Sequence, residues 1–185
     1  MAPRLVLLDR DGVLNHDRAD YVKTPAELVM IPGAAAAVAR LNAAGALVAV
    51  CTNQSAVGRG IIAAAMLERI HAQLRDMLAR DGARLDALFA CTEAPGPAST
   101  HRKPAPGMLI DALRKFRVLP TDAVMIGDSL RDLQAAQRAD VARILVRTGH
   151  GAATQAAGLP PEILPVAVHD DLAQAVASLL AESDR

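Results

Sequence analysis

The sequence predicts an α/β fold of the three-layer, Rossmann-like kind, with a mainly parallel sheet between two layers of helices. Short runs rich in Val, Ile and Leu alternate along the chain with longer segments whose apolar residues recur every three or four positions. An order of strand, helix, strand favours parallel pairing, because each right-handed crossover places its helix on one face of the sheet. A length of 185 residues suits one compact core, so we expect a single domain over residues 1–185.

Five short runs are expected to be strands, because each is continuously apolar like a strand that is buried on both faces. They cover residues 4–8, 47–51, 87–91, 123–126 and 142–146. Helical spacing of apolar residues marks three further segments, around residues 67–78, 109–116 and 172–180. An Ala-rich helix over residues 34–44 is expected to end at Gly45, and residues 92–101 and 149–165 are expected to be irregular loops.

Composition excludes several classes of function. Twenty basic and twenty acidic residues cancel, and the chain has no Trp, one Tyr and two Phe, so neither a basic surface nor an aromatic platform for nucleic acid is expected. No apolar run approaches the ~20 residues that cross a bilayer, and Asp9 ends the first run too early for a signal peptide. The two cysteines are expected to be reduced thiols, which favours the cytoplasm. We also expect a monomer without nucleic-acid or membrane partners.

Polar residues gather directly after the expected strands, at the sheet edge where open α/β folds bind ligands. Four such clusters are Asp9-Arg10-Asp11-Gly12, Thr52-Asn53-Gln54-Ser55, Arg102-Lys103 and Gly127-Asp128 with Asp132. Carboxylates about 4 Å apart repel by roughly 4 kcal/mol per pair at an effective dielectric of 20, so several together require a hard cation such as Mg²⁺. Because the lysine and threonine would complement a phosphate dianion, the set favours phosphoryl transfer.

The Asp-x-Asp spacing of Asp9 and Asp11 suggests a mechanism. One carboxylate at a strand end can attack phosphorus and form an aspartyl phosphate, a role that we assign to Asp9. The other can protonate the leaving oxygen and then take a proton from the hydrolytic water, a role that we assign to Asp11. Thr52 and Lys103 complete the predicted catalytic set as donors to the phosphoryl group.

In this order, the four clusters resemble the motifs of the haloacid dehalogenase (HAD) superfamily of phosphatases. The resemblance implies a Mg²⁺ ion bound by Asp9, the backbone carbonyl of Asp11 and Asp128. It leaves three roles open for Asp132: a contact to the metal through water, a helix cap, or a partner for Lys103. No large insertion follows the first or the third motif, so we expect no large cap domain.

Residues around these motifs are similar to those of the heptose bisphosphate phosphatases, from about residue 4 to Gly149. This family shares Thr-Asn-Gln and Arg-Lys-Pro with the histidinol-phosphate phosphatases, and Ser55 followed by Arg59-Gly60 favours the heptose branch. The resemblance implies a small phosphorylated sugar as substrate and removal of the C7 phosphate of D-glycero-D-manno-heptose 1,7-bisphosphate, a precursor of lipopolysaccharide heptose. The substrate contacts that it implies are Asp17, Arg18, Asp20, Tyr21, Asn53, Gln54, Ser55 and Arg102.

One loop departs from the pattern of this family, in which Cys-x-His and Cys-x-Cys hold a structural zinc ion. The corresponding positions here are Cys91, Glu93, Ser99 and His101. Because stable structural zinc sites use four Cys or His ligands, we expect no zinc in this protein. Pro95 and Pro97 are expected to order the loop instead.

Other functions stay open. Histidinol phosphate, another sugar phosphate or a nucleotide could be the substrate, and a comparison of turnover rates would separate them. A receiver-like regulatory domain also places Asp, Thr or Ser, and Lys on a parallel sheet, but it has no reason to carry a general acid and base at Asp11. Arg131, Arg138 and the five histidines receive no role in this mechanism.

Overall fold

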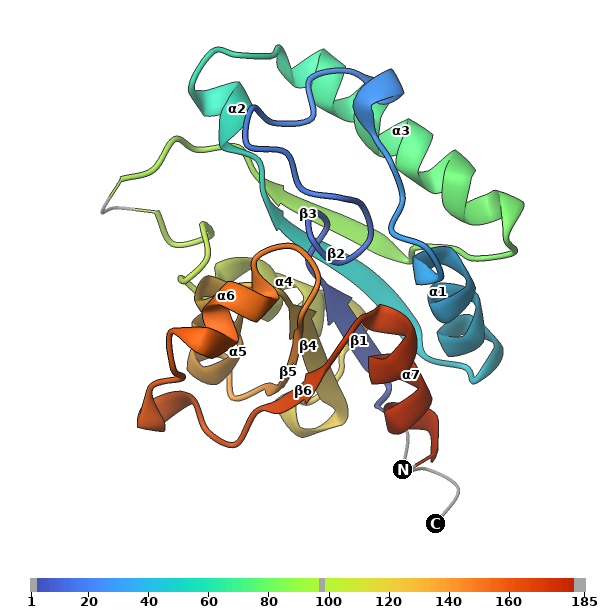
Figure 1. Cartoon of the computed structure of the whole chain (residues 1–185), viewed down its shortest axis with the longest axis vertical. Helices are drawn as coiled ribbons and strands as arrows, with labels where there is room; N and C mark the ends of the chain where they lie inside the picture. The colour runs from blue at the N-terminus through green and yellow to red at the C-terminus, as the bar shows by residue number, and fades with distance from the viewer. Residues whose placement is uncertain (1–2, 97–98, 182–185) are drawn as a thin grey trace.

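The structure, a computed structural model, describes residues 3–96 and 99–181, and within them a six-stranded sheet in which every pairing is parallel. The strands are β1 (Leu5–Leu8), β2 (Leu47–Asn53), β3 (Ala87–Cys91), β4 (Ala123–Gly127), β5 (Ala142–Val146) and β6 (Ala167–His169). Their order across the sheet is β3-β2-β1-β4-β5-β6 (Figure 1). The chain therefore builds the sheet outward from β1 in both directions, and the strand order reverses between β1 and β4, where such folds bind ligands.

Helices cover both faces of the sheet (Figure 1). One face carries α1 (Ala34–Ala43), α3 (Ala64–Arg80) and α7 (Leu172–Ala181), and the other carries α4 (Gly107–Phe116) and α5 (Leu130–Arg138). Two short helices, α2 (Ser55–Gly58) and α6 (Gly151–Ala156), follow the ends of β2 and β5. Single 3₁₀ turns lie at Pro25–Glu27, Pro120–Asp122 and Pro161–Ile163.

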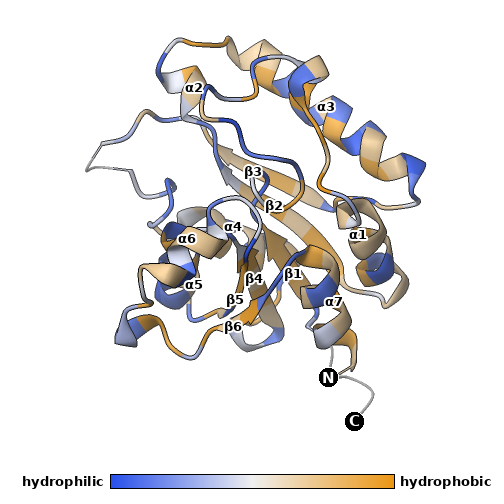
Figure 2. Ribbon diagram, in the orientation of Figure 1, coloured by the Kyte–Doolittle hydropathy of each residue, from blue (hydrophilic) through white to orange (hydrophobic). Residues whose placement is uncertain are grey.

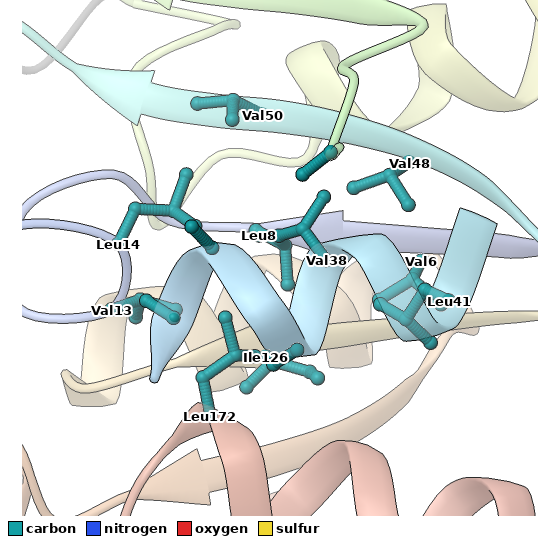
Figure 3. Packing of buried hydrophobic residues seen from close by; sticks show 14 of the residues in the cluster. Val6, Leu8, Val13, Leu14, Val38, Leu41, Val48, Val50, Ile126 and Leu172 are labelled. Carbon is teal, nitrogen blue, oxygen red and sulfur yellow. The ribbon is translucent and has the colours of Figure 1, made fainter. Parts of the chain in front are cut away.

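The alternation of side chains along the central strand divides the core in two. Val6 and Leu8 belong to the cluster beneath α1, α3 and α7, whereas Leu5 and Leu7 belong to the cluster with α4 and α5. Figure 3 shows residues of α1 packed against the first of these faces. The strands are largely apolar, while hydrophilic residues lie on the outer sides of the helices (Figure 2). Burial on both faces holds β1 rigidly, so the residues that follow it start from a fixed point.

The predicted three-layer α/β fold is confirmed, with β2 extending two residues further than expected, to Asn53, and β4 one residue further, to Gly127. The prediction of an irregular segment over residues 149–165 is wrong, because this segment contains α6 and a 3₁₀ turn. Strand β6 was also missed, since it has three residues, lies at the sheet edge and is only partly buried, which leaves no apolar run to detect. No helix in the described residues is long and apolar enough to cross a membrane.

Gly151 offers a test of the packing between α6 and the end of β5. A Cβ atom at this position would lie 1.6 Å from the carbonyl oxygen of Val146. Ala ordinarily stabilises a helix relative to Gly by up to about 1 kcal/mol. Here we expect the opposite sign, because the clash is with buried backbone: Gly151→Ala should lower the free energy of unfolding by about 1–3 kcal/mol, measured by urea denaturation.

The exposed neighbour Ala152 supplies the control for this measurement. Ala152→Gly should cost no more than about 1 kcal/mol, the ordinary difference in helix propensity. A Gly151→Ala variant as stable as the wild type would contradict the packing described for α6.

Candidate active site

The candidate site lies at the carboxyl ends of the central strands. Asp9 follows β1, Thr52 and Asn53 end β2, and Asp128 follows β4. Because β1 pairs in parallel with both β2 and β4, these residues emerge at the same edge of the sheet. A cavity of about 760 Å³ opens at this edge. Five segments that are far apart in the sequence, those after β1, β2, β3, β4 and β5, contribute to its wall.

Three carboxylates form the floor of the site. Asp9, Asp128 and Asp132 each offer one oxygen atom, and the three atoms lie within 4.8 Å of one another. Burial raises the pKa of Asp128 to about 6, and the charge of Asp132 adds to the effect. Burial also raises the pKa of Asp9, against the attraction of Lys103. Lys103 instead lowers the pKa of Asp132. A bound divalent cation such as Mg²⁺ would favour the ionised forms of Asp9 and Asp128, which burial disfavours.

Two glycines make room for Asp128. A Cβ atom at Gly12 would lie 2.0 Å from Oδ2 of Asp128, and one at Gly149 would lie 2.1 Å from the same atom. The backbone N–H of His150 donates a hydrogen bond of 2.8 Å to this oxygen. The loops after β1 and β5 therefore close around the carboxylate, and only residues without a side chain permit the approach.

Lys103 is the buried cation that faces the carboxylates. Its Nζ lies 3.0 Å from an oxygen of Asp9 and 2.6 Å from one of Asp132. Burial by itself would lower the pKa of Lys103, but Asp132 and Asp9 raise it above its ordinary value. The side chain of Asn53 holds the lysine's main chain from β2, accepting from its N–H at 3.0 Å and donating to its carbonyl at 2.9 Å. The lysine is thus charged and fixed in place.

Asp132 fills two of the three roles left open by the sequence. One oxygen accepts hydrogen bonds from the backbone N–H and the hydroxyl of Ser129, at 3.0 and 2.6 Å, and this capping box begins α5. The other oxygen pairs with Lys103. Gly127 allows the helix to sit this close, since a Cβ atom there would lie 2.3 Å from that of Asp132. A contact of Asp132 to a metal through water stays a prediction.

Asp11 occupies a different environment from the other carboxylates. The Arg10 guanidinium donates to both of its oxygens, at 2.8 and 2.9 Å, while Asn15 and Gln54 donate one further hydrogen bond each at 2.8 Å. Burial would raise the pKa of Asp11, but Arg10 together with these hydrogen bonds lowers it below its ordinary value. In this arrangement Asp11 is an ionised carboxylate beside the cavity.

Thr52 lies beneath the cavity rather than in its wall. Its side chain is 1% exposed, and its hydroxyl accepts a hydrogen bond of 2.9 Å from Gln54, the same amide group that donates to Asp11. Thr52 is not among the described residues that line the cavity. The end of β2 therefore supports Asp11 through Gln54, and the contact of Thr52 to a phosphoryl group stays a prediction.

The structure brings most of the predicted substrate contacts to the cavity. Asp20 is the exception: it does not line the cavity and instead pairs with Arg18 and Lys23 on the surface of the loop after β1. These ion pairs organise the turn that carries Arg18, and a direct contact of Asp20 to substrate stays a prediction. The predicted contacts that do line the cavity are Asp17, Arg18, Tyr21, Asn53, Gln54, Ser55 and Arg102.

Sequence reasoning missed several residues of the site. Arg59 and Arg131 line the cavity beside Arg102, although Arg131 was expected to have no role. Burial lowers the pKa of Arg102, and the nearby charges of Arg131 and Arg59 lower it further. His150 also lines the cavity, where its ring lies 2.9 Å from Asp17. Arg131 lies in the first turn of the helix that follows β4, and this position could have suggested a role in the site. The sequence does not show, however, which way that turn faces.

The loop after β3 is held by hydrogen bonds around Ser99. The Ser99 hydroxyl lies 3.8 Å from the sulfur of Cys91 and accepts from the backbone N–H of Arg102 at 2.8 Å. The ring of His101 pairs with Asp111 on α4, 2.9 Å away. Pro97 lies outside the described residues, so its expected role cannot be assigned, and the absence of zinc stays a prediction.

Comparisons with known proteins agree with this geometry. Residues 100–175 match the family described as HAD-hydrolase-like. The D-glycero-beta-D-manno-heptose-1,7-bisphosphate 7-phosphatases of Bordetella bronchiseptica and Pseudomonas aeruginosa are 43% and 41% identical to this chain. Each similarity covers 97% of this chain and 99% of the relative.

Solved structures give the same result. The crystal structure of D,D-heptose 1,7-bisphosphate phosphatase from B. bronchiseptica, complexed with magnesium and phosphate, has a TM-score of 0.91 and 43% identity, and covers 97% of this chain and 99% of that one. The corresponding enzyme from Burkholderia thailandensis has a TM-score of 0.75 and 38% identity, with 96% and 99% covered. This chain is therefore a phosphatase of the HAD superfamily and belongs to the heptose 1,7-bisphosphate 7-phosphatase family.

Proposed function

We propose that the protein removes the C7 phosphate of D-glycero-β-D-manno-heptose 1,7-bisphosphate. The observation that carries the chemistry is the cluster of Asp9, Asp128 and Asp132 around the ammonium of Lys103, with Asp11 held separately beside it. The heptose substrate and its β anomer follow from the names of the relatives that are 41–43% identical over nearly the whole chain. We further propose that the chain acts as a single domain, as a monomer in the cytoplasm, in the supply of lipopolysaccharide heptose.

The carboxylates fit a Mg²⁺ ion, which Asp9, Asp128 and the backbone carbonyl of Asp11 would hold. Bound there, the ion would neutralise charge on the phosphoryl oxygens and polarise phosphorus. The donor set consists of oxygen atoms alone, and the raised pKa values of Asp9 and Asp128 show two acids that a nearby positive charge would stabilise as carboxylates. The structure of the B. bronchiseptica relative contains magnesium and phosphate, which supports the same assignment here.

In the first step, a carboxylate oxygen of Asp9 forms a bond to phosphorus while the bond from phosphorus to the C7 oxygen breaks. Asp11 gives a proton to the departing oxygen, and Lys103 balances the charge of Asp9 and Asp132. The hydroxyl of Thr52 accepts from Gln54, so its own proton can turn to a phosphoryl oxygen. In the second step, Asp11 takes a proton from water, whose oxygen attacks phosphorus and releases Asp9.

The described position of Asp11 suits the second of these steps. Contacts from Arg10, Asn15 and Gln54 favour its ionised form, which is the form that accepts a proton from water. The first step needs the protonated form. Approach of a phosphate dianion raises the pKa of a neighbouring carboxyl group. Bound substrate would therefore raise the pKa of Asp11 and favour its protonated form.

A second phosphate explains the arginines at the cavity wall. Arg59, Arg102 and Arg131 lie near enough for the charges of Arg131 and Arg59 to lower the pKa of Arg102. Guanidinium groups that repel one another in a partly buried site are stabilised by an anion between them, and phosphate matches their geometry. A bisphosphate would place one phosphate at the carboxylates and the other at these arginines. This favours a bisphosphate over histidinol phosphate, and the receiver-like alternative is not supported, since the family is one of phosphatases.

The substrate assignment is tested by phosphate release with Mg²⁺ across a panel. The panel contains both anomers of the heptose 1,7-bisphosphate, histidinol phosphate, fructose 1,6-bisphosphate and mononucleotides. We expect the highest kcat/KM for the β anomer of the heptose. Equal rates across the panel, or preference for histidinol phosphate, would refute the heptose assignment while leaving the phosphatase chemistry in place.

Asp9→Asn tests the covalent step. Because an amide cannot serve as the nucleophile, turnover should fall by at least about a thousandfold, and no phosphate should remain covalently attached to the acid-quenched protein. Asp76→Asn is the matched control, because Asp76 is exposed on α3 and does not line the cavity, and its turnover should stay within about twofold of the wild type. Asp9→Asn activity within about tenfold of the wild type would exclude the aspartyl intermediate.

Arg131→Gln tests the second phosphate. Loss of one charged donor should raise KM for the bisphosphate by about tenfold or more and leave kcat nearly unchanged, because this phosphate does not react. A sugar carrying only the C7 phosphate should show no such rise. Arg114→Gln, an exposed arginine of α4 away from the cavity, is the control. An equal effect of Arg131→Gln on both substrates would argue against the proposed contact.

A further inference from the structure

A buried histidine of α3 reaches the site through Arg10. The loop after β1 passes beside α3 (Figure 1), and the Arg10 side chain turns inward from it, with 1% exposed. Nε and Nη2 of Arg10 donate to the Asp11 carboxylate. The remaining nitrogen, Nη1, lies 3.3 Å from Nε2 of His71, whose side chain is also 1% exposed. One guanidinium group therefore joins Asp11 to His71.

The hydrogen-bonding chemistry of Arg10 indicates the protonation state and tautomer of His71. A guanidinium group can only donate hydrogen bonds, so Nε2 of His71 must accept, and the ring is neutral with its proton on Nδ1. Burial lowers the pKa of His71 to about 4, and the charges of Arg10 and Arg75 act in the same direction. A neutral ring at physiological pH is the form that gives Arg10 an acceptor on the side away from Asp11.

Packing alone does not account for a histidine at this position. The other buried residues of α3 are aliphatic: Leu67, Ile70, Leu74 and Leu78. A leucine would bury more apolar surface there, and a buried polar ring costs stability unless its nitrogens are hydrogen-bonded. Without His71, Nη1 of Arg10 would lose this partner in a side chain that is 1% exposed, and the guanidinium would be free to rotate away from the carboxylate.

We propose that His71 is a positioning residue for Asp11: by accepting from Arg10, it fixes the orientation of the guanidinium that aligns the Asp11 carboxylate with the phosphoryl group. This inference rests on the proposed role of Asp11 as the acid and base of the reaction. It predicts that loss of the acceptor slows the step that needs Asp11's proton and leaves substrate binding nearly unchanged, since His71 does not line the cavity.

The test compares two leaving groups in the first turnover, followed by rapid quench with Mg²⁺ present. The sugar alkoxide needs a proton to depart, whereas p-nitrophenolate departs without one, so only the sugar phosphate depends on Asp11 in this step. His71→Leu should slow release of the sugar by about tenfold or more, slow release of p-nitrophenolate by less than about twofold, and leave KM for the sugar phosphate within about twofold. His71→Gln retains an acceptor and should restore the sugar rate to within about threefold of the wild type.

Two controls separate positioning from damage to the core. Leu78→Val perturbs the same face of α3 without touching Arg10, and should affect both leaving groups equally or neither. If His71→Leu fails to fold, His71→Met fills a similar space without a strong acceptor, and the same result is expected of it. An equal loss with both leaving groups, or a His71→Gln variant as slow as His71→Leu, would overturn the inference.

Asp11→Asn measured in the same way keeps the two proposals apart. Slow release of the sugar with near-normal release of p-nitrophenolate supports the acid role of Asp11, and the result for His71 then stands or falls alone. If Asp11→Asn slows release of the sugar and of p-nitrophenolate by the same factor relative to the wild type, that role is overturned, and the inference on His71 with it.

Discussion

The excess of buried negative charge at the ends of β1 and β4 is the constraint on which the rest of this structure depends. Asp9, Asp128 and Asp132 come within 4.8 Å of one another, and Lys103 is the buried lysine among them. Such a cluster costs stability, because burial and mutual repulsion both oppose ionisation. It persists because Lys103 pairs with Asp9 and Asp132, and because a backbone N–H donates a further hydrogen bond to each of the three carboxylates. The same unbalanced charge is what suits the site to a divalent cation.

The scaffold supplies that fixation from both sides of the sheet. β1 is buried on both faces, so Asp9 leaves a strand that has little freedom to move. Asn53 clamps the main chain of Lys103 from β2, and the capping box of α5 holds Asp132. Gly12, with its neighbour Gly149, lets two loops close on one carboxylate. A shift in any of these elements would change the distances between the carboxylates and the ammonium group of Lys103.

Charge is sorted by depth across the cavity. Carboxylates gather at the strand ends, where they suit a metal ion, while Arg59, Arg102 and Arg131 belong to the loops and to the first turn of α5, where they suit an anion. A substrate with a phosphate at each end could place one phosphate at the carboxylates and the other at the arginines. Asp11 stands apart from these two regions, since Arg10 and its partner His71 give it a separate hydrogen-bonded frame. The acid and base role proposed for Asp11 would draw on this separate set of hydrogen bonds.

The first five strands, the helices α1, α3, α4 and α7, the parallel sheet and the residues at the strand ends could be predicted from the sequence. They follow from local apolar periodicity and from the rule that parallel strands end at one edge. The sequence could not determine β6, whose three half-exposed residues leave no pattern, nor which way the first turn of α5 directs Arg131. The hydrogen bond from Gln54 to Thr52 and the contact of His71 with Arg10, sixty-one residues earlier in the chain, became visible with the three-dimensional fold. Such contacts depend on how separate elements pack together, and the spacing of residues in the sequence does not predict which of them meet.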